Sequence, residues 1–491
     1  MYILAIDQST AGTKAILFTA NGELVSRTDI PHRQITNEKG WVEHDPVEIY
    51  KNTVKACKKV VEESKIDKSL IKAVGISNQR ETAVCWNKET GEPVYNALVW
   101  QCGRAAYITD EIKKAGKDEL VRRVTGLNLS PFFSAPKFAW IVRNVSEARE
   151  LLQDDKLYCG NIDAWLLYKL TEGKEFKTDY SNASRTELLN LDTLQWDKDM
   201  VELFGIKESA LPTIQYSDSI FGYTTLEGLF DAPTPIHAIM GDSHSALYAN
   251  GCHSSFTAKA TFGTGTSVMM NAGLDRPKVT SKGVVESLAW GIEGKVNYSL
   301  EGNINYSGAI IKWLVDDIKL IANAKESEEI AATTESTNGV YLIPAFSGLG
   351  APYWNNEARA ILCGMSASTK KEHIVRAGLE AIAFQIKDIV EELNTCCRNP
   401  LHKLSVDGGA TKNQFLMQFV ADILNVDLAV SQIEELSAAG VAYLASIASG
   451  CATSETIFAR DLHTPMKPIM ASEQREKNYE GWKNAVNMLL K

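Results

Sequence analysis

Short apolar runs separated by small polar residues open the chain and predict a β-hairpin. YILAI at residues 2–6 is followed by the turn-forming DQSTAGT and by a second run, KAILFT, at residues 14–19. An Asn-Gly pair at residues 21–22 predicts a tight turn into a third strand. Apolar residues at helical spacing begin at Pro46, behind Asp45 as the N-cap, and the apolar run IKAVGIS predicts a buried strand after them. A hairpin continued by a helix and a further strand is typical of the α/β class.

The second half of the chain repeats this order of elements. FTAKATF at residues 256–262 leads through GTGTS into VMMNAG, and the strand HKLSVDGGA, the helical NQFLMQFVADIL and the strand DLAVSQ follow later. We therefore expect two related α/β domains, residues 1–250 and 251–491, that face one cleft. Gly251 is expected to end the last helix of the first domain.

The composition is that of an ordinary globular protein. Of the 491 residues, 45% are hydrophobic and 23% are charged, and the formal net charge is −10. This acidic balance argues against nucleic acid or an anionic membrane surface as a partner. An anionic substrate would need a locally positive site or a metal ion. No apolar run approaches the roughly 20 residues that span a bilayer, so membrane insertion is not expected.

The cysteines and the first residues bear on the cellular compartment. Nine cysteines are scattered without a Cys-x-x-Cys pair, and the adjacent Cys396 and Cys397 are too close for an ordinary bridge. This usage predicts reduced thiols. The chain opens on a strand, without the basic segment and the long apolar segment of a signal peptide. Both features predict a cytoplasmic protein.

Three turns rich in Gly, Ser and Thr could hold phosphate groups. They are DQSTAGTK, FGTGTS and DGGATKN, and each follows a predicted strand. Small residues let consecutive backbone N–H groups approach an anion. Asp7 could hold Mg²⁺ through water, and Lys14 could add a point charge. Each turn alone is more commonly an ordinary turn, and none is a Walker A or Rossmann motif, but their equivalent places in the two halves favour phosphate binding.

Two further stretches carry candidate chemistry for hydroxyl groups. Adjacent Arg80 and Glu81 supply the donors and acceptors that bind hydroxyls, and Trp100 could close an apolar wall. Taken singly, a surface ion pair and a core tryptophan are the simpler interpretations. In GDSHSA at residues 241–246, Asp242 could be a general base, or Ser243 could be the nucleophile of a hydrolase. The hydrolase is disfavoured because a second Gly is missing and a His beside the Ser cannot easily turn onto its hydroxyl.

Longer strings carry a resemblance to a known family. FFSAPKFAWIVRN fits the first signature of the FGGY carbohydrate kinases, and AILCGMSASTKKEHIVRAGLE fits the second except at Gly378. The chain resembles this family over nearly its whole length, and within it the glycerol kinases are most similar. The strings that carry the likeness to glycerol kinases are WVEHDP, GISNQRET, NALVWQC, TDYSNASRT, LPTIQYS, FGTGT, FSGLGAPYW and DGGATKNQFLMQF.

The resemblance implies a fold, cofactors and site residues. The fold would be two ribonuclease-H-like domains of the actin/Hsp70 ATPase type that flank a catalytic cleft, and the ligands would be ATP, Mg²⁺ and a small polyol or sugar. Asp242 falls on the catalytic Asp of the family, and Asp7 falls on the residue associated with the metal. Arg80, Glu81 and Trp100 fall on polyol-binding positions. The positions that contact the nucleotide in the family correspond to Thr10, Thr13, Lys14, Thr264, Gly308, Lys312, Gly409 and Asn413 of this chain.

Four positions depart from the glycerol kinases. Ser243 replaces a Gln, Phe132 replaces a Tyr, Ser267 replaces a Phe that packs against glycerol, and Lys312 replaces a Gln near the nucleotide. The two small side chains should enlarge the substrate pocket, and the missing hydroxyl removes a hydrogen-bond partner. We therefore predict phosphorylation of a terminal hydroxyl of a four- or five-carbon polyol or a ketose. If the changes compensate one another, the alternative is a true glycerol kinase that produces glycerol 3-phosphate.

Other interpretations remain at this stage. A non-metabolic actin/Hsp70-like ATPase would contain the phosphate turns without a polyol site. A zinc enzyme is disfavoured because the eight His show no ligand spacing. The segment EGLFDAPTPIH does not reproduce the loop at which some bacterial glycerol kinases bind a sugar bisphosphate. A homodimer or a homotetramer is compatible with the family.

Overall fold

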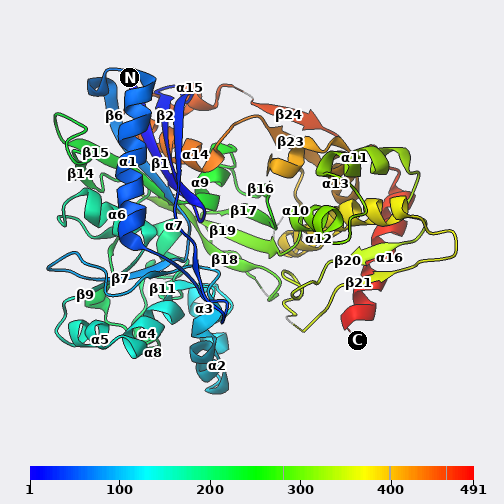
Figure 1. Ribbon diagram of the computed structural model, residues 1–491, viewed down its shortest axis with the longest axis horizontal. Helices are drawn as coiled ribbons and strands as arrows, with labels where there is room; N and C mark the ends of the chain where they lie inside the picture. The colour runs from blue at the N-terminus through cyan, green and yellow to red at the C-terminus, as the bar shows by residue number, and fades with distance from the viewer. Residues whose placement is uncertain (280, 356, 397–399, 461, 491) are drawn as a thin grey trace.

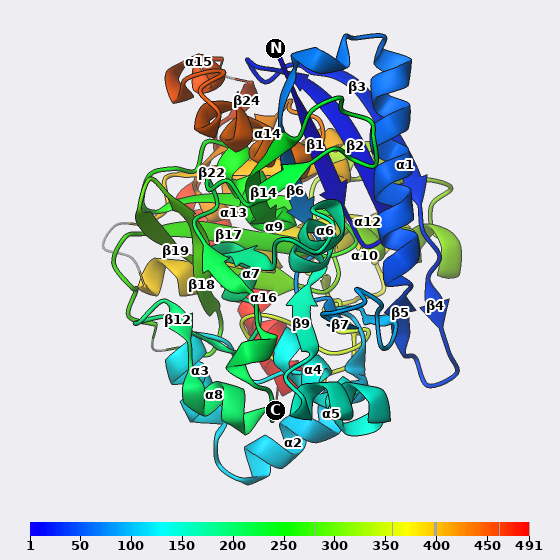
Figure 2. The same cartoon turned by 90° about the vertical axis from the view of Figure 1, so that its left-hand side faces the viewer.

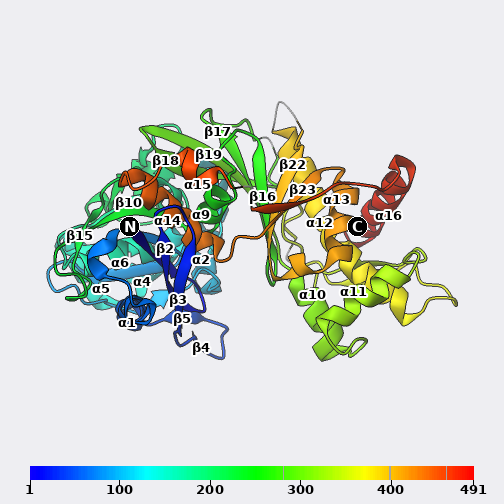
Figure 3. The same cartoon turned by 90° about the horizontal axis from the view of Figure 1, so that it is seen from above.

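Two large mixed sheets, each covered by helices, organise the chain (Figure 1). The computed structural model describes residues 1–279, 281–355, 357–396, 400–460 and 462–490. Seen from above, the first sheet with α1 (Pro46–Ser64) and the helices α12 (Lys371–Thr395), α13 (Gln414–Leu424) and α16 (Ser472–Leu490) lie on opposite sides of the molecule (Figure 3). This arrangement confirms the predicted α/β class.

The first sheet has the order β14-β15-β6-β1-β2-β3. Strands β1 and β2 pair antiparallel, as the hairpin prediction requires, and β6 and β15 continue the sheet parallel to β1. The predicted helix is confirmed as α1, whose N-cap Asp45 accepts a hydrogen bond from the Val47 amide. The strands are β1 (Tyr2–Gln8), β2 (Gly12–Thr19), β3 (Leu24–Pro31), β6 (Ile71–Asn78), β14 (Gly222–Thr224) and β15 (Thr234–Gly241).

Helices cover both faces of this sheet, which explains why its central strands β1 and β6 are buried along almost their whole length. Leu4 and Ile6 face α1 and α6 (Ile162–Leu170), whereas Ile3 and Ala5 face α9 (Asp242–Ala249) and α14 (Leu436–Ala448). Helix α14 comes from the second half of the chain. The boundary at residue 250 stays a prediction, and in space the second half contributes a helix to the first sheet.

The second sheet repeats the pattern of the first in the order β18-β19-β17-β16-β22-β23-β24. β16 and β17 form an antiparallel pair, and β22 and β23 run parallel to β16. The strands are β16 (Thr257–Phe262), β17 (Thr266–Gly273), β18 (Val285–Ile292), β19 (Lys295–Ile304), β22 (Lys403–Gly408), β23 (Asp427–Ser431) and β24 (His463–Met466).

A smaller five-stranded sheet with its own helices extends the first sheet (Figure 2). Its strands are β4 (Ile35–Thr36), β5 (Val42–His44), β8 (Ala97–Leu98), β7 (Ala83–Asn87) and β9 (Leu157–Asn161), and its helices include α2 (Ala106–Lys114), α3 (Asp118–Thr125), α4 (Ser134–Asn144), α5 (Ser146–Gln153) and α8 (Lys198–Leu203). Among the described cysteines all are free thiols, as predicted; Cys397 lies outside the described residues. None of the helices in the described ranges has the length and the apolar run that crossing a membrane requires.

A buried carboxyl group ties the C-terminal helix to α12. Asp388 accepts hydrogen bonds from Tyr353, Tyr479 and Trp482 at 2.8–2.9 Å. Burial outweighs these three donors and raises the pKa of Asp388 to about 6.

The raised pKa of Asp388 predicts a pH-dependent stability. Between pH 4 and pH 6 the unfolded chain releases this proton while the folded chain keeps it, so a rise in pH favours unfolding. The difference from the ordinary value of 3.8 corresponds to about 3 kcal/mol. We expect the free energy of unfolding of the native protein, relative to Asp388→Asn, to fall by about this amount from pH 4 to pH 7 in urea titrations. Parallel pH profiles of the two proteins would contradict the prediction.

Candidate functional site

Three predicted site residues meet where parallel strands of the first sheet end. Asp7 lies at the end of β1, Arg80 follows β6, and Asp242 follows β15. These strands are neighbours, with Asp7 opposite Ser77 and Gly241 opposite Asn78. The carboxyl ends of parallel strands form one edge of a sheet, and ligands of α/β proteins bind at such edges. The structure therefore brings Asp7, Arg80 and Asp242 together.

Asp242 is the first residue of α9 and remains partly accessible. Its side chain is 34% exposed, and its Oδ1 lies 3.3 Å from Nε of Arg80. The amide of Ser243 donates a 2.6 Å hydrogen bond to the same oxygen, and the amide of Gly241 donates to Oγ of Ser181 at 2.9 Å. The carboxylate is thus oriented from its own helix and from a neighbouring segment, with its remaining surface open to a ligand.

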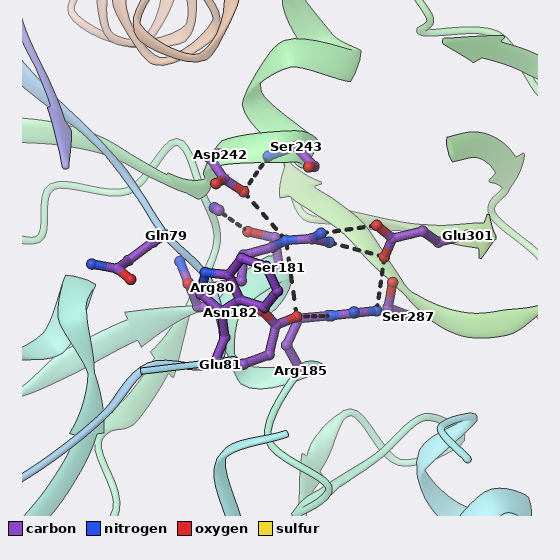
Figure 4. Close-up of polar contacts among 12 residues, drawn as sticks. Gln79, Arg80, Glu81, Ser181, Asn182, Arg185, Asp242, Ser243, Ser287 and Glu301 are labelled. Atoms are coloured by element: carbon purple, nitrogen blue, oxygen red, sulfur yellow. Dashed lines mark hydrogen bonds and ion pairs between the residues drawn. The ribbon is translucent and has the colours of Figure 1, made fainter. Parts of the chain in front are cut away.

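Arg80 and Glu81 belong to a buried cluster of opposite charges (Figure 4). Two hydrogen bonds of 2.8 and 3.0 Å join the guanidinium of Arg80 to the carboxylate of Glu301. Arg185 donates from Nε to Oε1 of Glu81 at 2.6 Å, and its Nη1 lies 3.0 Å from Oε2 of Glu301. Glu81 adopts a φ of 61°, a left-handed conformation that is uncommon for Glu and is held here by the surrounding contacts.

Electrostatics explains why these buried groups are charged. Burial disfavours the ionised form of Glu301, but Arg80 and Arg185 outweigh this cost and hold the pKa of Glu301 well below its usual value. Burial also disfavours the charge on Arg80, and the carboxylates of Glu301 and Glu81 outweigh it and raise the pKa of Arg80. Isolated buried charges would be strongly unfavourable, so each member of the cluster depends on its partners.

Arg185 and Glu301 were not among the predicted site residues. Arg185 had a signal in the sequence, since it lies within the string TDYSNASRT. Glu301 lies in the strand KVNYSLEGNI, whose mixed polar and apolar residues do not mark it as buried. A buried charge on a strand is rare without a partner. The sequence alone does not show which partner that is.

Aromatic side chains and a cavity border the cluster. The rings of Trp100 and Phe132 meet edge to face at 5.4 Å, and Nε1 of Trp100 donates to Oγ1 of Thr10 at 2.9 Å. Beyond Phe132 lies a cavity of about 420 Å³. Its lining includes Phe133, Arg185, Val285, Asn303, Asn305 and Trp354. Ser267 does not line this cavity; its hydroxyl donates a 3.0 Å hydrogen bond to Oε1 of Glu301.

Four of the predicted nucleotide-binding residues line a second cavity, in the part of the chain that forms the second sheet. Gly308, Lys312, Gly409 and Asn413 border a space of about 830 Å³. Lys325 and Lys412 add two further positive charges. Asp316 and Glu328 lie in the same lining, so the three lysines leave only a small positive excess there, the sign that an anionic ligand needs in an acidic protein.

The glycines near this cavity have different structural roles. A Cβ at Gly308 would lie 2.6 Å from the carbonyl oxygen of Gly263, so this glycine lets α10 (Gly308–Lys312) pack against the GTG turn. Thr264, in that turn, accepts hydrogen bonds from the amides of Ser307 and Ala309 through its carbonyl oxygen and is absent from the lining of the second cavity. A Cβ at Gly409 would meet no atom within 4 Å.

This open space at Gly409 leads to a test. Gly409→Val adds three carbons to the lining of the second cavity, and its Cβ has no protein atom within 4 Å. We expect the KM for ATP to rise by about tenfold and the thermal transition to stay unchanged. Steady-state kinetics and thermal unfolding measure both quantities, and an unchanged KM for ATP would remove Gly409 from the nucleotide site.

The donor set at Asp7 fits a Mg²⁺ ion bound together with phosphate groups. Oδ1 of Asp7 is buried and has no hydrogen-bond partner among the described residues, and burial raises the pKa of Asp7 to about 7. No three His, Cys, Asp or Glu side chains within the described ranges are placed to hold a metal ion. Mg²⁺ takes one or two carboxylates and completes its shell with water and phosphate oxygens, which matches this arrangement.

The other residues of the first turn are placed as follows. Thr13 is buried, and its hydroxyl is also unpartnered among the described residues. Nζ of Lys14 forms a 2.5 Å ion pair with Glu435.

The hydrolase alternative does not fit the structure. The ring nitrogens of buried His244 have no hydrogen-bond partner in the described part of the chain, so Ser243 and His244 do not form the couple that a hydrolase needs.

Comparison with known proteins covers the whole chain. Models of the N-terminal and C-terminal domains of the FGGY family of carbohydrate kinases match residues 2–249 and 258–449. The chain is 46% identical to glycerol kinase 1 of Thermotoga maritima, with 100% of both sequences covered. It is 44% identical to a glycerol kinase of Caldanaerobacter subterraneus, with 100% of this chain and 99% of the relative covered.

Solved structures show the same similarity. The crystal structure of Plasmodium falciparum glycerol kinase with ADP matches with a TM-score of 0.94 at 35% identity, covering 100% of this chain and 98% of the other. A xylulose kinase of Lactobacillus acidophilus matches with a TM-score of 0.87 at 22% identity, covering 98% and 95%, which bears on the fold alone.

Proposed function

Because the chain belongs to the FGGY family of carbohydrate kinases and is thus an ATP-dependent phosphotransferase, we propose that its acceptor is the terminal hydroxyl of glycerol. The observation that carries the proposal is the partly exposed carboxylate of Asp242 beside Arg80 and Glu81. The names of the full-length relatives favour glycerol over longer acceptors. The sequence predicted a four- or five-carbon acceptor, with a true glycerol kinase as the alternative, and the relatives support this alternative better.

The residues at the strand ends would share the acceptor chemistry. Asp242 accepts the proton of the attacking hydroxyl as its oxygen forms a bond to the γ-phosphorus of ATP and the bond to the β,γ-bridging oxygen breaks, so that ADP leaves. Arg80 donates to acceptor hydroxyls through N–H groups that Glu301 does not occupy, and Glu81 accepts from them. Trp100 and Phe132 cover the carbon atoms.

The nucleotide would span the two sheets. The cavity lined by Gly308, Lys312, Gly409 and Asn413 would hold the nucleoside end, and Thr10, Thr13, Lys14 and Thr264 would face the phosphates. Asp7 would hold Mg²⁺ through water, and the ion neutralises phosphate charge. Exclusion of water from the γ-phosphate favours transfer to the acceptor over hydrolysis.

A longer polyol is the second candidate, and one observation favours it. A cavity of about 420 Å³ is lined by Phe132 on one side and includes Asn303 and Asn305, whose amides would bind additional hydroxyls. Ser243 and Ser267, where glycerol kinases have Gln and Phe, do not line this cavity, so their small side chains bear only on the space beside Asp242 and Glu301.

A panel of acceptors separates these candidates. ADP release with ATP and Mg²⁺ is measured for glycerol, erythritol, threitol, pentitols and pentuloses. The highest kcat/KM with glycerol supports the proposal, and the highest value with a four- or five-carbon acceptor supports the second candidate. ADP release that no acceptor increases would contradict both.

A further inference from the structure

Glu301 joins the two halves of the molecule at the acceptor site. It lies in β19 of the second sheet, and its side chain is fully buried. Its carboxylate contacts Arg80, which follows β6 of the first sheet, and Arg185, which follows α7 (Tyr180–Ala183) (Figure 4). Ser267, in the neighbouring strand β17, donates to the same carboxylate at 3.0 Å. The second half thus supplies the carboxylate on which two arginines of the first half converge.

The orientation of Arg80 depends on this carboxylate. Nε of Arg80 is 3.3 Å from Asp242 and 3.9 Å from Glu81, whereas both terminal nitrogens bind Glu301. A bidentate carboxylate fixes both the position and the plane of a guanidinium. Without Glu301, the closest remaining carboxylate for Arg80 would be Asp242, the proposed base.

The orientation of Glu81 depends on Glu301 indirectly. Arg185 is shared between the two carboxylates, with Nε on Glu81 and Nη1 near Glu301. All three side chains are at most 3% exposed, so water cannot replace a missing partner. Loss of the Glu301 charge would leave two buried guanidiniums to share Glu81 and Asp242.

We propose that Glu301 is a positioning residue for the acceptor: it holds Arg80 directly, and Glu81 through Arg185, in the orientation that binds acceptor hydroxyls, and Ser267 holds Glu301 in turn. This inference rests on the proposed function. It also assigns to Ser267 a hydrogen-bonding role, in addition to the space that its small side chain leaves. Because the nucleotide cavity lies elsewhere, the effect of Glu301 is specific for the acceptor.

The test compares Glu301→Gln with a matched control. Glu286 is a buried carboxylate in the adjacent strand β18, and it pairs with Arg276 at 2.8 Å outside the acceptor site. We expect Glu301→Gln to raise the acceptor KM by about tenfold or more and the KM for ATP by less than about twofold. Glu286→Gln should change neither KM by more than about twofold. Glu301→Asp, which keeps the charge, should recover part of the loss.

A milder variant covers the case in which Glu301→Gln does not fold. Ser267→Ala removes one hydrogen bond and no charge, and we expect it to raise the acceptor KM by about threefold with an unchanged KM for ATP. The inference would be overturned if both Glu301→Gln and Ser267→Ala had the native acceptor KM. If Glu301→Gln does not fold, a native acceptor KM in Ser267→Ala alone would overturn it. Equal increases in the KM for ATP and for the acceptor would also overturn it. A native protein without acceptor-dependent ADP release would instead contradict the proposed function, and the native assay alone shows this.

Discussion

Asp242→Asn is expected to lower kcat by about 10³-fold, because Asn fills the same space but cannot accept the proton of the attacking hydroxyl. The amide oxygen can still accept the hydrogen bond from the Ser243 amide, so α9 should keep its first turn. ATP affinity should stay within about twofold of native, since the nucleotide cavity does not include this residue. Coupled ADP release gives kcat, and isothermal titration calorimetry gives the affinity for ATP.

The control for this prediction is an aspartate with a similar ion pair away from the site. Asp231 pairs with Lys68 at 2.7 Å and is 78% exposed. Asp231→Asn should have native kinetics. If Asp242→Asn retained more than about one tenth of the native kcat, Asp242 would not be the base.

Gly440→Val is expected to destabilise the protein by about 3 kcal/mol or more. Gly440 lies in α14 where this helix crosses α9, and a Cβ there would lie 2.0 Å from the carbonyl oxygen of Ser245. Backbone atoms cannot move aside as a flexible side chain can. The two helices must therefore separate, which exposes the buried face of the first sheet. Thermal unfolding, followed by circular dichroism, measures the loss.

Gly103→Val is the matched control, because a Cβ at Gly103 would meet no atom within 4 Å. Its thermal transition should stay near that of the native protein. A native-like transition for Gly440→Val would show that α14 does not pack against α9 as closely as the structure has it. Since α9 begins with Asp242, any folded fraction of Gly440→Val should also have a reduced kcat.

Much of the scaffold could be predicted because it follows from local patterns. The hairpin of β1 and β2, the N-cap of α1 and the helix α13 each depend on residues close together in the sequence. The convergence of Asp7 and Asp242 was also predictable, since both follow apolar runs that form parallel strands of one sheet.

The partners of the charged residues could not be predicted in this way. The contact between Arg80 and Glu301 joins residues 221 positions apart, and no local pattern encodes it. The small sheet was missed for a different reason: β4 and β8 have two residues each, too few for a periodic signal. Helix α14 comes late in the chain, yet it packs on the first sheet, whose strands come from the first half. Only the tertiary fold shows this contact.

Ser267, which stands where glycerol kinases have a Phe, has a second role that its small size does not reveal. From sequence, Ser267 is a small side chain that leaves room in the acceptor pocket. In the structure its hydroxyl binds Glu301, so the substitution changes a hydrogen-bond network as well as a volume. Acceptor preference therefore depends on the orientation of Arg80 and Glu81 together with the space around them.

The most direct test of the central claim is the fate of the γ-phosphate of ATP. Native protein is incubated with ATP, Mg²⁺ and glycerol, and the products are followed by ³¹P NMR. We predict that a phosphomonoester of glycerol forms in a one-to-one ratio with ADP, and that Asp242→Asn slows the formation of both by about 10³-fold. The account would be contradicted if inorganic phosphate formed in place of the ester, and if it formed at the same rate with and without any of the polyols and ketoses. That result would indicate an ATPase that has no acceptor.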